Sequence, residues 1–253
     1  MKAQFKYAFL AGLYFRAPVF AVIFVMNTVF IILGSLEMLP LAALITSVSL
    51  GGVAIAVMLA ANIGGDVAIA RRMFNTPEAY LHALTPVPRW KTLLAAVIAM
   101  SVMDLVTMVF VVAAQVWLSF NLAGGGLWQI VLDFLRENES YLIDGLWYIL
   151  LGIASYFLLI MIIMFCVTAK KSIFYRMPAS GLLSFLLACA CFYVANLLLL
   201  VLAPLSEVHR VLFFIILSPT SRLAFPVVVV FTLLEAGALF VLTSKLLERK
   251  VNL

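Results

Sequence analysis

Six long apolar runs, separated by short polar segments, constrain this chain more than any other feature of its sequence. A helix needs about 20 mostly apolar residues to cross the hydrocarbon core of a bilayer, and each run is close to that length. The runs are 17–36, 41–61, 93–116, 146–167, 182–202 and 225–242. We therefore predict an all-α, polytopic membrane protein with six transmembrane helices.

The composition excludes an ordinary water-soluble domain. Of the 253 residues, 66% are hydrophobic and only 11% are charged, whereas soluble domains carry charged side chains at roughly a quarter of their positions. The net charge of +5 comes from short basic clusters between the apolar runs. Basic clusters in this position are typical of the loops that set the orientation of transmembrane helices. We therefore expect membrane lipid as a partner and no nucleic acid.

The distribution of Lys and Arg predicts the orientation of the spans, because cytoplasmic loops retain positive charge. With the N-terminus inside, the only basic residues left on the outer side are Arg136, Arg210 and Arg222. The thirteen assigned to the cytoplasmic side are Lys2, Lys6, Arg16, Arg71, Arg72, Arg89, Lys91, Lys170, Lys171, Arg176, Lys245, Arg249 and Lys250. We expect both termini to be cytoplasmic in a single-domain, multi-pass protein of a bacterial plasma membrane.

Three segments outside the spans carry further expectations. Residues 1–16 place apolar side chains and Arg16 at helical spacing, which suits an amphipathic helix in the headgroup plane or a simple anchor. Residues 121–143 form an outer segment. A second outer segment, 203–223, contains an apolar stretch too short to span, so we predict a re-entrant or interface helix before the last span.

The longest cytoplasmic stretch, residues 62–91, contains the signals of a short helix over 77–84. Thr76 is a favoured N-cap, Pro77 suits the first helical position, and Glu78 places an acid in the first turn. Pro86 and Pro88 would end the helix. Such a helix indicates either a contact point for another protein or an ordinary interfacial cap.

The sequence contains no recognisable set of catalytic residues. A P-loop places glycines before a Lys-Thr or Lys-Ser pair. The two such pairs in this chain, Lys91-Thr92 and Lys171-Ser172, lack those glycines, so any nucleotide hydrolysis must come from another chain. His82 and His209 are assigned to opposite sides of the membrane and cannot share a site. We therefore assign no catalytic residue, no metal and no cofactor to this chain.

Two carboxylates, Asp104 and Glu235, fall near the middle of the third and sixth predicted spans. A charge is costly there and often marks function. Within the predicted spans no Lys or Arg is present to pair with them. They are either protonated and hydrogen-bonded to a neighbouring helix, or they face a water-filled cavity. Asn27 and Asn196 are expected to form hydrogen bonds between helices.

Together these features resemble the membrane subunit of a bacterial type-2 ABC exporter. The most specific local pieces are YLHALTPVPRWKTLLAAVIA, from residue 80, and the ending LLERKVNL. The first is similar to the stretch that leads from the coupling helix into the third span in bacterial members. Thr85-Pro86 here replaces the Leu-Pro pair of many members.

The resemblance implies a permease that forms a translocation path and works with a separate ATPase subunit, which binds ATP and Mg. It also implies a second permease subunit, identical or different. The segment 75–89 would contact the ATPase. Its candidate coupling residues are Asn75, Pro77, Glu78, Tyr80, Leu81, Leu84, Pro86 and Arg89.

Two other functional classes fit the sequence. A secondary transporter would use Asp104 and Glu235, although inverted repeats and discontinuous helices typical of that class are not evident. A membrane immunity or interaction protein without transport, or an intramembrane enzyme, is the other class. In these classes, substitutions of Asp104 or Glu235 should abolish function while substitutions in the inner loop are tolerated. An ABC permease predicts the opposite pattern.

Overall fold

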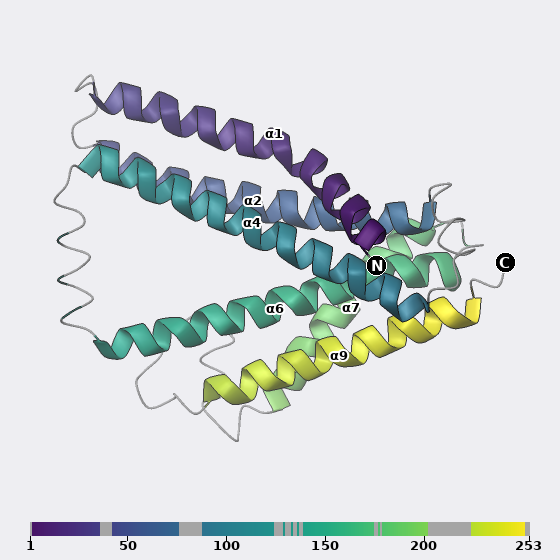
Figure 1. The fold of residues 1–253 in the computed structure, drawn as a ribbon. Helices are drawn as coiled ribbons and strands as arrows, with labels where there is room; N and C mark the ends of the chain where they lie inside the picture. Colours follow the sequence, from purple (N-terminus) through teal and green to yellow (C-terminus); the bar gives the residue numbers. More distant parts are fainter. Residues whose placement is uncertain are drawn as a thin grey trace. The chain divides into compact units, whose positions relative to one another are not determined.

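The computed structural model describes residues 2–35, 42–75, 88–123, 129, 133, 136, 139–174, 177, 179–201 and 224–250. Most of these residues form helices, and none of them forms a strand (Figure 1). The helices are α1 (Lys2–Ser35), α2 (Ala42–Asn75), α4 (Arg89–Ala123), α6 (Glu139–Ser172), α7 (Ser180–Val201) and α9 (Ala224–Lys250). All six are long and apolar enough to cross a membrane, which confirms the predicted all-α, six-span architecture.

Four helices extend well beyond the apolar runs that predicted them. α1, α2 and α6 have 34 residues each and α4 has 35, so each is roughly 50 Å long at a rise of 1.5 Å per residue. A hydrocarbon core is only about 30 Å thick. Residues 62–75, which we expected in a cytoplasmic loop, are the last turns of α2.

α1 is one continuous helix that begins at Lys2 and contains Pro18. Residues 2–16, expected as a separate interfacial helix, are its first turns. Figure 1 shows α1 bending towards its N-terminal end. Pro18 accounts for such a bend, because proline lacks the amide hydrogen that would bond to the preceding turn.

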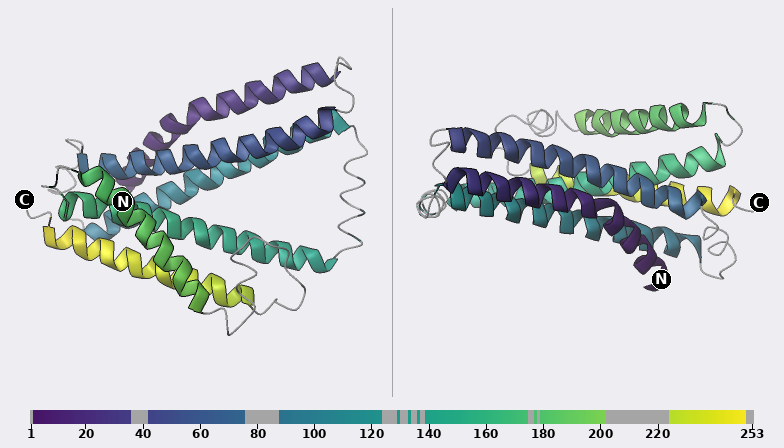
Figure 2. Two further views of the ribbon diagram at one scale, coloured as in Figure 1. Left: turned by 180° about the vertical axis from the view of Figure 1, so that it is seen from behind. Right: turned by 90° about the horizontal axis from the view of Figure 1, so that it is seen from above.

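The helices group into two compact units, and the first comprises Met1–Ile69 and Ile98–Glu139. In this unit α1, α2 and α4 are neighbours in both views of Figure 2. Their core includes the buried side chains of Ile23, Ala54, Met58 and Val111. Aromatic pairs add to the contact between α1 and α4: the ring centroids of Phe20 and Phe110 are 4.7 Å apart, and those of Phe24 and Trp117 are 6.0 Å apart.

The second unit comprises Ala70–Val97 and Ser140–Leu253. It contains α6, α7 and α9, the last turns of α2 and the first turns of α4. The hydroxyl of Ser184 on α7 donates to the carbonyl of Cys166 on α6 at 3.0 Å. Leu93 and Val97 on α4 are buried, as are Met161 and Met164 on α6. α2 and α4 therefore each contribute residues to both units.

Several predicted features lie outside the described residues. These are the short inner helix over 77–84, the outer helix within 203–223, and most of the outer segment 121–143. They stay predictions. The described part of the chain nevertheless includes both helices that flank the inner segment, α2 and α4.

Candidate functional site

Arg16 is a fully buried cation in the first membrane-spanning helix. Its side chain has 0% exposure, and it lies within the apolar stretch Phe5–Ile32 of α1. A guanidinium in such a place is stable only when acceptors compensate for the water that it has lost. Its contacts therefore identify the polar groups of the first unit that stabilise this buried charge.

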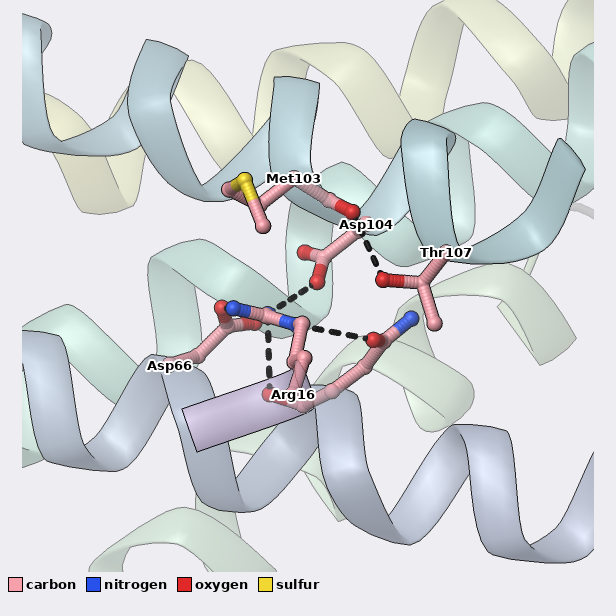
Figure 3. Close-up of polar contacts among 6 residues, drawn as sticks. Arg16, Asp66, Met103, Asp104 and Thr107 are labelled. Carbon is pink, nitrogen blue, oxygen red and sulfur yellow. Dashed lines mark hydrogen bonds and ion pairs between the residues drawn. The ribbon is translucent and has the colours of Figure 1, made fainter. Parts of the chain in front are cut away.

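Three side chains from two other helices surround the Arg16 guanidinium (Figure 3). Nε donates to Oδ1 of Asn62 at 3.0 Å, and Nη2 donates to Oδ1 of Asp66 at 2.9 Å. The same Nη2 donates to Oδ1 of Asp104 and lies 3.4 Å from the backbone carbonyl of Asn62. We call Arg16, Asn62, Asp66 and Asp104 the Arg16 cluster. It joins α1, α2 and α4 within the first unit.

The helical repeat explains how α2 presents two acceptors to one cation. Asn62 and Asp66 are four residues apart, so their side chains lie on the same face of α2. α4 supplies Asp104 from across the bundle. Its neighbour Thr107 donates instead to the carbonyl of Met103 in the same helix, at 2.7 Å, and is no ligand of the guanidinium.

Glycines make the space that the buried guanidinium occupies. A Cβ on Gly65 of α2 would lie 2.8 Å from Nη1 of Arg16, and one on Gly12 of α1 would lie 2.9 Å from the same nitrogen. On Gly64, a Cβ would lie 3.1 Å from the ring of Phe15. Real Cβ atoms essentially never lie within 3.0 Å of a neighbour, so a side chain at Gly65 or Gly12 would force the Arg16 guanidinium to shift from its present position.

The structure corrects our interpretation of Arg16 and Asp104. We expect Arg16 to lie outside the spans and Asp104 to have no Lys or Arg within a span. Both expectations are wrong, because Arg16 is buried within the apolar stretch of α1 and forms an ion pair with Asp104. Asn62 and Asp66 were missed because we placed them in a loop. The sequence signals for this packing are the pattern Gly64-Gly65-Asp66 and the spacing of four residues between Gly12 and Arg16.

Glu235, the other predicted intramembrane carboxylate, belongs to the second unit, whereas Asp104 belongs to the first. It lies within the stretch Pro226–Glu248 of α9. Both of its carboxylate oxygens are buried, and neither has a hydrogen-bond partner among the residues that the structure describes. The described part of α9 therefore offers no counterpart of the Arg16 cluster.

The candidate coupling residues are only partly described. Asn75 is the last residue of α2, and Arg89 is the first residue of α4. The Arg89 guanidinium donates through Nη1 to the carbonyl of Leu247 near the end of α9. The remaining candidates, Pro77, Glu78, Tyr80, Leu81, Leu84 and Pro86, lie outside the described residues.

The two in-span asparagines differ in their contacts. Asn27 donates from α1 to the carbonyl of Ala114 on α4 at 3.0 Å, which is the expected hydrogen bond between helices. Asn196 is half-buried and donates to the carbonyl of Phe192 in its own helix at 2.7 Å. The prediction is confirmed for Asn27, whereas the hydrogen bond described for Asn196 lies within α7.

The chain matches no protein-family model, no curated protein and no solved structure in comparisons with each. Among the described residues, no group of three or more His, Cys, Asp or Glu side chains is placed to hold a metal ion. The functional argument therefore depends on the geometry of the helices and of the Arg16 cluster.

Proposed function

We propose that this chain is the membrane-spanning subunit of an ATP-driven ABC exporter. In this proposal it forms the translocation path with a second membrane subunit, a copy of itself or a different chain. A separate ATPase subunit binds ATP and Mg and engages the inner segment 75–89. The site of action is the plasma membrane of a bacterial cell.

The observation that carries the proposal is that both helices on either side of that segment, α2 and α4, are long; α1 and α6 are similarly long but do not border the segment. At roughly 50 Å each, they exceed the 40–45 Å of a whole bilayer including its headgroups. Arg71 and Arg72 near the end of α2 are exposed, as expected for turns that extend past the membrane. An ATPase bound to the segment would hold the ends of two rigid helices.

Contacts along these helices would carry a displacement into the rest of the subunit. In the first unit, the Arg16 cluster connects α2 and α4 to α1. In the second unit, Arg89 connects the start of α4 to the carbonyl of Leu247 on α9. Because α2 and α4 contribute residues to both units, movement of the inner segment would bias both of them.

Co-expression with candidate ATPase subunits, above all any encoded beside this chain, tests the proposal. We expect a stable complex in lipid with vanadate-sensitive ATP hydrolysis. Leu81→Asp, in the expected coupling helix, should uncouple the complex while the spans remain inserted. Gln129→Asp adds the same charge at an exposed position in the outer segment and should leave coupling unchanged. Failure to associate with any plausible ATPase would contradict the proposal.

A secondary transporter is the second candidate, and the buried carboxylates of Asp66 and Asp104 favour it. Intramembrane carboxylates commonly mark ion or proton pathways. This alternative predicts substrate movement in vesicles without any ATPase, driven by an ion gradient and abolished by Asp104→Asn or Glu235→Gln. Transport that requires ATP hydrolysis would rule it out.

A further inference from the structure

The Arg16 cluster places two carboxyl groups against one nitrogen atom. Oδ1 of Asp66 and Oδ1 of Asp104 both accept from Nη2 of Arg16. Their side chains are 1% and 4% exposed. A guanidinium that neutralises one carboxylate often does so through two parallel hydrogen bonds, whereas here one of its nitrogens serves two acids.

The charges of the cluster do not balance when both acids are ionised. Two carboxylates and one guanidinium leave a net charge of −1 in the interior of the first unit. The other charged residues of that unit whose side chains the structure describes, Lys6, Asp133 and Arg136, are exposed. An uncompensated buried charge is costly, and two close carboxyl groups respond by retaining a proton.

One buried polar atom of the cluster supports the same conclusion. Oδ2 of Asp66 has no hydrogen-bond partner among the residues that the structure describes. An orphaned oxygen costs less on a neutral carboxyl group than on a carboxylate, because the neutral group loses less hydration on burial. We infer that the Arg16 cluster is a proton-binding site that holds one proton on the paired carboxyl groups of Asp66 and Asp104.

This assignment is independent of the proposed transport function. It predicts that asparagine, a neutral isostere of a protonated aspartic acid, is accepted at either position but not at both. One substitution leaves a single carboxylate opposite the guanidinium, and the cluster is then neutral without a proton. Two substitutions leave the Arg16 cation unpaired in an apolar interior.

Infrared spectroscopy of the full chain in lipid nanodiscs at neutral pH tests the assignment through the carbonyl stretch of a protonated carboxyl group. Glu235→Gln serves as the background, because Glu235 is another carboxyl group within a span. We expect one protonated-carboxyl band in this background. Adding either Asp66→Asn or Asp104→Asn should abolish the band completely, with the protein still monodisperse.

The opposite results would overturn the assignment. A background spectrum without the band, or a band that persists with both single substitutions, would show that the cluster holds no proton. If neither single variant yields folded protein, both acids are required as carboxylates, which also overturns it. Size-exclusion profiles and thermal stability of all variants separate loss of the band from loss of the fold.

Discussion

Nη2 of Arg16 lies 2.9 Å from Oδ1 of Asp66, and both side chains are buried although the residues are 50 positions apart in the chain. The same nitrogen contacts Asp104, which is 88 positions from Arg16. These contacts fix the register of α1 against α2 and α4, because a shift of either helix by one residue would separate the charges.

Replacing Gly65 with alanine tests how tightly the guanidinium is enclosed. The new methyl group would lie 2.8 Å from Nη1 and 2.9 Å from Cζ of Arg16, so the guanidinium must shift, which disturbs its hydrogen bonds to Asn62 and Asp66. We expect a destabilisation of about 1–3 kcal/mol, the usual cost of overpacking, measured by unfolding in lipid bicelles.

Gly52→Ala is the matched control in the same helix, since nothing lies within 4 Å of its Cβ position. It should be neutral or slightly stabilising, because alanine favours a helix over glycine by up to about 1 kcal/mol. Equal effects of the two substitutions would mean that the close contact at Gly65 has no energetic weight.

The two asparagines give a second paired comparison. Asn27→Leu removes the hydrogen bond from α1 to the carbonyl of Ala114 and should destabilise the first unit by roughly 0.6–1.7 kcal/mol, as interhelical hydrogen bonds do in membranes. Asn196→Leu removes only a hydrogen bond within α7 and should cost less. The same unfolding assay measures both, and a larger loss at Asn196 would contradict the described contacts.

Arg89→Met should loosen the end of α9. The substitution removes the donor to the carbonyl of Leu247, so amide hydrogen exchange near the C-terminal turn of α9 should be faster in the variant. Lys91→Met removes the same charge nearby, but the Lys91 ammonium lies over the ring of its neighbour Trp90 at 5.4 Å. This control should leave exchange in α9 unchanged; equal acceleration in both variants would assign the effect to charge alone.

Hydropathy was sufficient to predict the six spans, because length and apolar composition are properties of each segment by itself. The ends of the helices were harder to predict. α2 continues to Asn75, past the end of its apolar run, and Asn62 and Asp66 in this continuation bond to Arg16 inside the protein. A hydropathy window registers such residues as polar and ends the span too early.

The Arg16 cluster itself could not be derived from a single sequence. Its members come from three segments that were each interpreted by local rules: Arg16 as a cytoplasmic charge, Asp66 as a loop residue and Asp104 as an isolated carboxylate. Only the packing of α1 against α2 and α4 shows that their charges are complementary. Asp104 could be singled out from the sequence because the cost of burying its charge is visible from its own segment.

The most direct test of the central claim, that Arg16, Asp66 and Asp104 form one buried network, compares unfolding free energies in lipid bicelles for Arg16→Met, Asp66→Asn and Asp104→Asn alone and for the triple variant. Removing the cation alone leaves two buried acids and should cost about 3–5 kcal/mol. The triple variant has no charge in the cluster and should regain most of that stability. If the triple variant is instead as unstable as the sum of the separate substitutions, the three residues act independently and the network is contradicted.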